Sequence, residues 1–286
     1  MKNQMSLFQG SLAIVALALG HGPSLLRAES KPKPEELIRS HLERLASPDA
    51  LRERTTMVAR GVCELKIITG GGALISGQTL LLSENRNLSI ELHFGLAEYT
   101  GEHYVLKDGD VSVAYTTPGR RSPLGEFLLA QNLILKEGLL GGVYSTAWPL
   151  IDFPERKARV KVKGLKKVDD RRLQVLEYQI PRSGNLRTEL FFDPETNDHV
   201  RTEYSLRISA GQSLTPEAAG RTRSIRYRME ERFSDFKDFD GYRLPTRWVV
   251  QFSRDGDGPT LLWQWTSELR EFSQNQPISP DRFELK

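Results

Sequence analysis

Cysteine is almost absent from this sequence: Cys63 is the single one among 286 residues. One thiol cannot form an internal disulfide, and no histidine lies near it in the sequence to activate it as a nucleophile. Cys63 lies between Val62 and Leu65 in a strand-like run, so we expect it to be a small buried core residue. The sequence therefore excludes an internal disulfide and does not favour a cysteine nucleophile.

Histidine is also scarce, with five in the whole chain. None of them occurs in an H-x-H or H-x-x-x-H pair, the spacings that support a metal site on a strand or a helix. His93 and His103 fall on neighbouring predicted strands and could meet across a ladder, but two histidines alone make a weak metal site. We expect ordinary packing there, and the sequence predicts neither a metal nor a cofactor.

Motifs for catalysis are missing as well. No serine lies in a G-x-S-x-G motif, and no pair of carboxylates stands out as a general acid and base. The glycines at 70–72 precede a strand-like run that begins at Leu74, whereas a phosphate-binding loop needs a following helix. We therefore expect no catalytic residues and a protein that is not an enzyme.

A concentrated charge of one sign is lacking too, since the formal net charge is only +3. Such a weak and scattered excess does not predict a nucleic-acid partner. The clearest basic row, Lys157, Arg159, Lys161 and Lys163, alternates with apolar residues and predicts a solvated strand face. The alternative for this row is a site for an anionic headgroup or an acidic partner.

Only the N-terminus has a continuous apolar run. Lys2 is followed by apolar residues from Leu12 to Leu19, a run too short to span a membrane, which takes about 20 residues. Together with Ala28 at a plausible cleavage point, this pattern predicts a signal peptide over 1–28 and an exported, periplasmic protein. The alternative is an uncleaved anchor.

Period-two alternation dominates the remaining chain. An amphipathic helix is predicted over 35–46, with a short second one to Glu53. Clean alternation of apolar and charged residues at 200–208 and 225–233 is typical of antiparallel strands with one buried face. Strands are predicted near 55–69, 73–83, 87–95, 101–107, 110–116, 157–168, 172–181, 186–193, 200–208, 225–233, 242–253 and 260–271. We expect one domain over 29–286, mainly β, whose curved antiparallel sheet of about ten or eleven strands forms an unclosed half-barrel with helices on its concave face.

Residues 122–150 interrupt this pattern with a dense apolar stretch. Ser122 is predicted to cap a helix that runs to about Lys136, and a shorter helical piece follows Gly138, before Trp148-Pro149 ends the stretch. A sheet with an apolar face must cover it, so we expect this stretch to lie on the concave face. The candidate cavity or lid residues are Phe127, Leu128, Leu133, Leu139, Tyr144 and Trp148, with Trp248 facing them from the sheet. The alternative is that the same residues are ordinary core.

Several short motifs, in their order along the chain, resemble a known superfamily. They are the early helix from Glu35 to Leu45, the run from Phe191 to Thr196, the runs 233–236 and 240–245, and the terminal Asp281-Arg282-Phe283. The sequence resembles the LolA-like superfamily of outer-membrane lipoprotein-sorting proteins, which includes LolB-like and RseB-like domains. The resemblance implies an unclosed β-barrel with a helical lid, a periplasmic location and a lipoprotein acyl chain as ligand. It also implies an arginine on an early strand that latches the lid, and Arg60 is the position that fits.

The sequence therefore predicts a monomeric periplasmic carrier that holds a lipid or lipoprotein acyl chain in an apolar cavity. Membrane-bound transport partners are further candidates. The alternative function is an RseB-like periplasmic sensor or scaffold that binds a protein partner.

Overall fold

The computed structural model describes residues 31–69, 71–209, 224–256 and 258–285, and the predicted signal peptide lies outside them. In this part of the chain no helix has the length and apolar character needed to cross a membrane.

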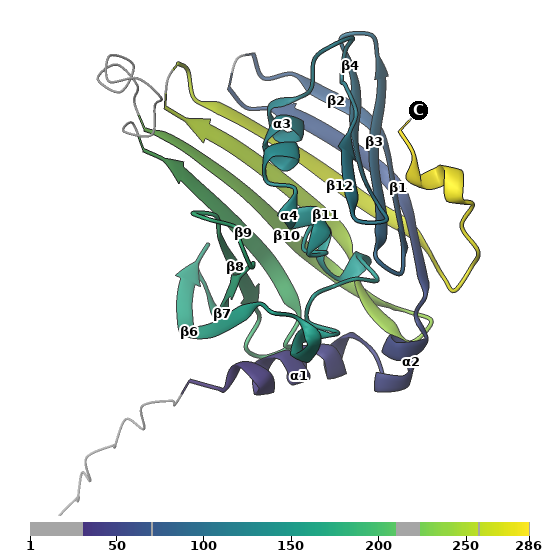
Figure 1. Cartoon of the computed structure of the whole chain (residues 1–286), viewed down its shortest axis with the longest axis vertical. Coiled ribbons are helices and arrows are strands. Elements are labelled where there is room, and N and C mark those ends of the chain that lie inside the picture. Colours follow the sequence, from purple (N-terminus) through teal and green to yellow (C-terminus); the bar gives the residue numbers. More distant parts are fainter. Residues whose placement is uncertain (1–30, 70, 210–223, 257, 286) are drawn as a thin grey trace, which may run out of the picture. The chain divides into compact units, whose positions relative to one another are not determined.

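Strands make up most of the described residues (Figure 1). They are β1 (Thr56–Ile67), β2 (Leu74–Glu84), β3 (Asn87–Leu96), β4 (Tyr99–Lys107), β5 (Asp110–Val113), β6 (Arg159–Val168), β7 (Arg171–Gln179), β8 (Arg187–Phe192), β9 (His199–Ile208), β10 (Ile225–Phe239), β11 (Tyr242–Asp255) and β12 (Leu261–Gln274). The helices are α1 (Pro34–Leu45), α2 (Pro48–Glu53), α3 (Pro123–Ala130) and α4 (Leu133–Lys136), with 3-10 helices η1 (Gly142–Tyr144), η2 (Phe153–Glu155) and η4 (Pro280–Phe283). The predicted mainly β class is confirmed, with twelve strands in place of ten or eleven.

All twelve strands form one antiparallel sheet in the order β5-β4-β3-β2-β1-β12-β11-β10-β9-β8-β7-β6. The first strand of the sequence, β1, and the last, β12, are neighbours in the middle of the sheet. The two edge strands, β5 and β6, are consecutive in the sequence. The sheet curls into an unclosed half-barrel, as expected for an open sheet of this size. The connection 114–158 must run from one edge to the other, and it does so over the concave face, where Figure 1 shows α3 and α4 in front of the strands. We call this connection the crossover segment.

The two faces of the sheet differ as the alternation predicted. On β9 and β10, Tyr204, Met229 and Phe233 point into the core on the concave side. The residues that alternate with these inward positions point outward and form ion pairs across the strands, such as Arg201 with Glu230 at 2.7 Å. Cys63 is buried in the core, as predicted.

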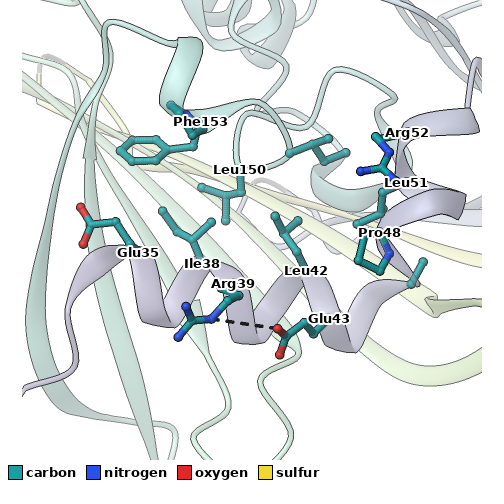
Figure 2. A pocket seen from close by; sticks show the side chains of 13 residues that line it. Glu35, Ile38, Arg39, Leu42, Glu43, Pro48, Leu51, Arg52, Leu150 and Phe153 are labelled. Carbon is teal, nitrogen blue, oxygen red and sulfur yellow. Dashed lines mark ion pairs between the residues drawn. The ribbon is translucent and has the colours of Figure 1, made fainter.

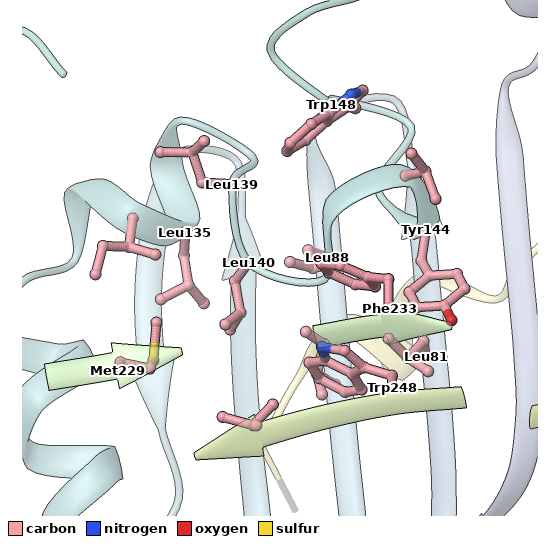
Figure 3. Packing of buried hydrophobic residues seen from close by; sticks show 14 of the residues in the cluster. Leu81, Leu88, Leu135, Leu139, Leu140, Tyr144, Trp148, Met229, Phe233 and Trp248 are labelled. Atoms are coloured by element: carbon pink, nitrogen blue, oxygen red, sulfur yellow. The ribbon is translucent and has the colours of Figure 1, made fainter. Parts of the chain in front are cut away.

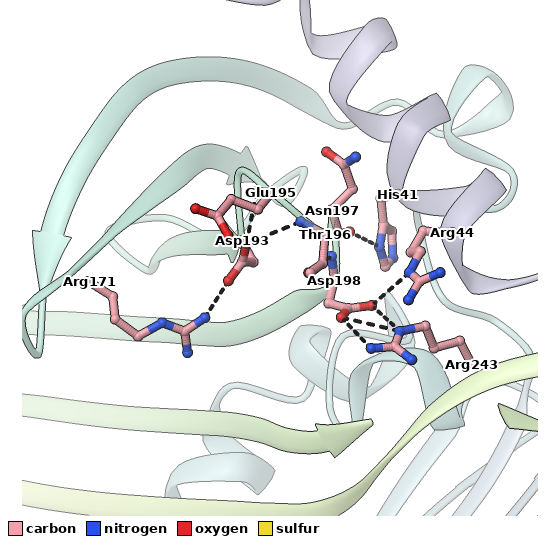
Figure 4. A network of polar contacts seen from close by, with 9 residues as sticks. All are labelled: His41, Arg44, Arg171, Asp193, Glu195, Thr196, Asn197, Asp198 and Arg243. Atoms are coloured by element: carbon pink, nitrogen blue, oxygen red, sulfur yellow. Dashed lines mark hydrogen bonds and ion pairs between the residues drawn. The ribbon is translucent and has the colours of Figure 1, made fainter. Parts of the chain in front are cut away.

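The first helix is tied to the sheet through the β8–β9 turn (Figure 4). His41 of α1 donates from Nδ1 to the carbonyl oxygen of Asn197 at 3.1 Å. The neighbouring Asp198 is buried, accepts from Arg243 of β11 at 3.0 Å and lies 3.7 Å from Arg44 of α1. One turn therefore joins α1, β9 and β11 at the same end of the sheet.

The helix predicted from Ser122 to about Lys136 is interrupted. Ser122 caps α3 as predicted, accepting from the backbone N–H of Gly125 at 2.8 Å. Gln131 then leaves the helical region with φ −107° and ψ 45°, and α4 is a separate short turn. Irregular structure also continues past Trp148-Pro149 through η2, because the chain has still to reach the far edge strand β6.

Candidate functional site

The crossover segment packs its apolar side chains directly onto the concave face (Figure 3). Leu135, Leu139 and Leu140 lie in one cluster with Leu81 and Met229 of the sheet. Tyr144 adds ring contacts to Phe233 and Trp248, with centroids 6.1 and 6.3 Å apart. Its hydroxyl group donates to the carbonyl oxygen of Pro245 at 2.8 Å. The segment thus covers the apolar interior by direct contact.

A buried glutamate on β10 holds the middle of the segment. Glu231 Oε1 accepts from the backbone N–H of Gly141 at 2.8 Å and from Trp248 Nε1 at 3.0 Å. Its Oε2 accepts from the Tyr204 hydroxyl at 2.8 Å. Burial disfavours the charged carboxylate and raises the pKa of Glu231 to about 7, although these three hydrogen bonds oppose the shift.

A second buried glutamate holds the start of α3. Glu102 of β4 accepts from the hydroxyls of Tyr104 and Ser122, each at 2.8 Å, and from Tyr99. Ser122 therefore donates to Glu102 while it caps α3. Desolvation again raises the pKa, to about 7 for Glu102.

An arginine between α2 and β1 holds the end of the same stretch. Arg54 is buried and donates to the carbonyl oxygens of Val143 at 3.1 Å and Ser145 at 2.9 Å. Burial lowers its pKa to about 10, which still leaves it charged at neutral pH. Arg60, the predicted latch, is exposed on the outer face of β1, opposite Leu80 in the β1–β2 register. No bond joins Arg60 to the crossover segment in the described structure, whereas Arg54 makes two.

A buried histidine fixes Trp148. Trp148 Nε1 donates to His41 Nε2 at 3.2 Å, while His41 Nδ1 donates to the Asn197 carbonyl oxygen. This pattern requires the neutral tautomer with the proton on Nδ1. Burial lowers the pKa of His41 to about 4, against the opposing effects of the Asn197 bond and the Asp198 charge.

One cavity opens at the α3 end of the segment. It has a volume of about 570 Å³ and mostly apolar walls. Phe127 of α3 lines it and stacks on Tyr227 of β10 with centroids 5.7 Å apart. Leu206, Ile208 and Leu261 add to the walls. Three arginines border it: Arg120, Arg121 and Arg254.

A second cavity, of about 470 Å³, lies at the opposite end of the segment, between the N-terminal helices and residues 150–154 (Figure 2). Ile38, Leu42 and Leu51 face Leu150 and Phe153 across it. Its rim carries charges of both signs: Glu35, Arg39, Glu43 and Arg52.

The structure does not bring all the predicted site residues together at one cavity. Phe127 borders the α3 cavity, whereas Leu128, Leu139 and Trp148 are fully buried core residues and Leu133 is half-buried beside them. Trp248 faces Tyr144 and Glu231, not Phe127. Sequence reasoning missed Glu102, Glu231 and Arg54. The signal available for the two glutamates was a charged residue at an inward position of an alternating strand, and Arg54 lies outside any strand.

Histidine, cysteine and carboxylate groups do not gather in threes as a metal site would require, over the residues that the structure describes. His93 and His103 are not direct partners across the ladder, since the register pairs His103 with Glu91 and His93 with Gly101. His103 bonds to Ser89 at 3.0 Å instead.

No protein-family model matches the sequence, and neither does any curated protein sequence. Solved structures do match. A LolA superfamily protein from Nitrosomonas europaea is 15% identical with a TM-score of 0.46, over 87% of this chain and 97% of the other. A DUF1329 family protein from Desulfovibrio piger is 11% identical with a TM-score of 0.44, over 89% and 98%. A putative outer membrane lipoprotein-sorting protein domain from Vibrio parahaemolyticus is 9% identical with a TM-score of 0.39, over 87% and 95%. All three matches have identities of 15% or less and TM-scores below 0.5.

Proposed function

We propose that this protein is an exported, non-enzymatic binding protein for the acyl chain of a lipid or lipoprotein, which enters the cavity beside Phe127. The observation that carries the proposal is this cavity of about 570 Å³, a size typical of small-molecule sites. Phe127, Leu206 and Tyr227 belong both to its walls and to the apolar cluster under the crossover segment. An acyl chain that enters here therefore meets apolar surface as it goes deeper.

Deeper binding requires the crossover segment to move away from the sheet. Most of its contacts with the concave face are apolar and nondirectional. An acyl chain can replace them, because burial of each methylene group stabilises the complex by about 0.8 kcal/mol. Directional contacts add to the apolar ones, and the buried charged groups Glu102, Glu231 and Arg54 form the ones that act as latches for the closed arrangement. The crossover segment is in this proposal a lid that packs as core when no ligand is bound.

The test compares two matched substitutions, Leu206→Glu in the α3 cavity and Leu42→Glu in the α1 cavity. Both positions are half-buried and apolar, so each variant places one carboxylate in one cavity. Uptake of a fluorescent fatty acid is titrated, and near-ultraviolet circular dichroism checks that each variant is folded. Leu128→Glu would be a poor test, because Leu128 is fully buried and the charge would disrupt the core.

We expect Leu206→Glu to weaken uptake by about tenfold or more, because a buried charge beside an alkyl chain is unfavourable, and Leu42→Glu to change it little. The opposite result would move the binding site to the α1 cavity. Equal, unchanged uptake in both folded variants would refute acyl-chain binding in either cavity and favour a sensor or scaffold function.

A further inference from the structure

The end of the sheet that lies away from α1 and α2 carries the turns of several hairpins. The β1–β2 and β3–β4 turns, the end of β9, the start of β10 and the β11–β12 turn all lie there, as the strand register requires (Figure 1). We call it the hairpin end. The mouth of the cavity beside Phe127 lies at this end too, since Ile208 and Leu261 line it.

Exposed large apolar side chains gather at the hairpin end. Leu74 is 62% exposed and Tyr115 is 52% exposed. Ile68, Leu96 and Ile208 are exposed at the same end. A single exposed leucine needs no explanation, but several on adjacent turns are typical of an interaction surface.

Six arginines lie on strands and loops that reach the hairpin end. They are Arg120, Arg121, Arg207, Arg226, Arg228 and Arg254. Arg121 stacks on Tyr115 with its guanidinium 4.2 Å from the ring centroid and lies 3.5 Å from Glu126. None of the other five has an ion pair with any residue that the structure describes. The carboxylates of these turns are Glu98, which is exposed, and Asp255, which lies opposite Arg226 in the β10–β11 register.

Ion pairs do occupy part of the outer face next to these arginines. On β6, Lys163 pairs with Glu177 at 2.9 Å and Lys166 with Glu189 at 3.3 Å. At the hairpin end the register instead places Arg207 directly opposite Arg226. Like charges in such a pair destabilise the sheet unless an anion lies between them.

A polar cavity of about 610 Å³ lies among these basic residues. Arg187, Arg207, Arg226 and Arg228 line it, and so do Thr188 and Glu177, the partner of Lys163. The hydroxyl oxygen of Thr188 is buried without a hydrogen-bond partner in the described structure. Several guanidinium groups around a polar cavity suit a phosphate group, because each can donate two parallel hydrogen bonds to its oxygens.

We propose that the hairpin end docks on the surface of an anionic phospholipid bilayer, with the arginines bound to headgroup phosphates and the apolar turns inserted at the interface. One end of the sheet offers partners for both parts of such a surface. The unpaired arginines can bind the phosphates, and Leu74, Leu96 and Tyr115 can insert at the acyl boundary. Docking in this orientation turns the mouth of the Phe127 cavity toward the membrane. The inference goes beyond acyl-chain binding and does not depend on it.

The protein is purified after export, and its N-terminus is sequenced. The test is co-sedimentation of this protein with lipid vesicles. One set of vesicles is phosphatidylcholine alone, and the other also contains phosphatidylglycerol. The charge variant is Arg207→Glu with Arg226→Glu, and its matched control is Lys161→Glu with Lys163→Glu, the same change of charge elsewhere on the outer face. The apolar variant is Leu74→Ser with Leu96→Ser, and its control is Leu165→Ser, an exposed leucine on β6. Every variant carries the same N-terminus as wild type.

We expect wild type to bind the phosphatidylglycerol vesicles in a salt-sensitive way and to bind phosphatidylcholine weakly. The arginine variant should bind about tenfold more weakly or worse, the leucine variant several-fold more weakly, and both controls nearly as wild type. Absence of wild-type binding, or equal losses in the arginine variant and the lysine control, would overturn the proposal. Displacement by inorganic phosphate together with unchanged binding of the leucine variant would also overturn it, in favour of a soluble phosphate ligand. Fatty-acid uptake without vesicles should persist in the arginine variant, so a failure here is distinct from a failure of acyl-chain binding.

Discussion

Glu102 and Glu231 are buried on the concave face, and each receives its hydrogen bonds from hydroxyl or N–H donors without an ion pair to any described residue. A carboxyl group in the unfolded chain titrates near 4.5, whereas burial raises the pKa of both groups to about 7 in the folded protein. Between these values the folded protein keeps a proton that the unfolded chain has lost. Each glutamate therefore lowers the free energy of unfolding as the pH rises from about 4.5 to 7, by about 3 kcal/mol at most.

His41 has the opposite effect. Its pKa is lowered from 6.5 to about 4 in the folded protein, so the unfolded chain binds a proton that the folded protein does not. The free energy of unfolding therefore falls as the pH drops from 6.5 toward 4. Because the two effects oppose each other, substitution of a single group is needed to separate them.

Glu231→Gln isolates one of these groups. The amide oxygen can accept from Gly141 N–H and Trp248 Nε1, and the amide nitrogen can donate to the Tyr204 hydroxyl oxygen, which reverses the bond that Tyr204 donates to Oε2. We expect a free energy of unfolding raised by roughly 3 kcal/mol at pH 8 and nearly unchanged at pH 5. Urea unfolding at both pH values measures this.

Glu268→Gln is the control for this prediction, since Glu268 is exposed and pairs with Arg247 on the surface. It should change the free energy of unfolding little at either pH. A Glu231→Gln protein less stable than wild type at pH 8 would contradict the prediction, because the charged form would then stabilise the closed segment.

Arg54→Met tests whether Arg54 holds the crossover segment in place, and Arg60→Met is its matched control. Arg54→Met leaves the carbonyl oxygens of Val143 and Ser145 without their donors. We expect a loss of about 2–4 kcal/mol in the free energy of unfolding, faster amide exchange over residues 141–148 and faster fatty-acid uptake. Arg60 is exposed, so Arg60→Met should stay within about 0.5 kcal/mol of wild type. Equal exchange rates in the two variants would show that Arg54 does not hold the segment.

At the scale of the element, the shape of the crossover segment depends on a close approach of two backbone stretches. Gly138 has φ +78°, and a Cβ atom there would overlap the carbonyl oxygen of Ala147. Arg156 fastens the same loop by donating to the carbonyl oxygens of Glu137 at 2.8 Å and Ala147 at 2.9 Å. The loop before η1 is therefore built on a glycine and closed by an arginine.

Gly138→Ala should consequently destabilise the protein much more than Gly184→Ala. Both glycines have positive φ, but nothing lies near the position of a Cβ atom at Gly184. We expect a cost of about 1 kcal/mol at Gly184 and about 3 kcal/mol or more at Gly138, measured by thermal unfolding. Similar costs at both positions would mean that the loop relaxes without loss of packing.

At the scale of the whole described structure, the topology explains why the crossover segment lies over the concave face. The edge strands β5 and β6 are consecutive in the sequence but lie at opposite edges of the sheet. The chain between them must cross the open side of the half-barrel, and an apolar sequence is needed there because the concave face is apolar. The two ends of the sheet then differ, with α1 and α2 tied to one end and the exposed arginines and apolar turns at the other.

Local residue patterns were enough to predict the strands, the first two helices and the apolar character of the crossover segment, because period-two alternation and helix capping depend on neighbours in the sequence. The pattern did not reveal that α3 would end at Ala130, since that break serves packing against the sheet. Nor did it reveal the bonds that Glu102, Glu231 and Arg54 form with the crossover segment. A charge at an inward strand position is stable only when distant donors or acceptors surround it, and only the tertiary structure brings Gly141, Tyr204 and Trp248 to one carboxylate. The exposed arginines at the hairpin end could not be predicted either. The net charge of the chain is near zero, and a local excess of positive charge is visible only once the strands are placed in register.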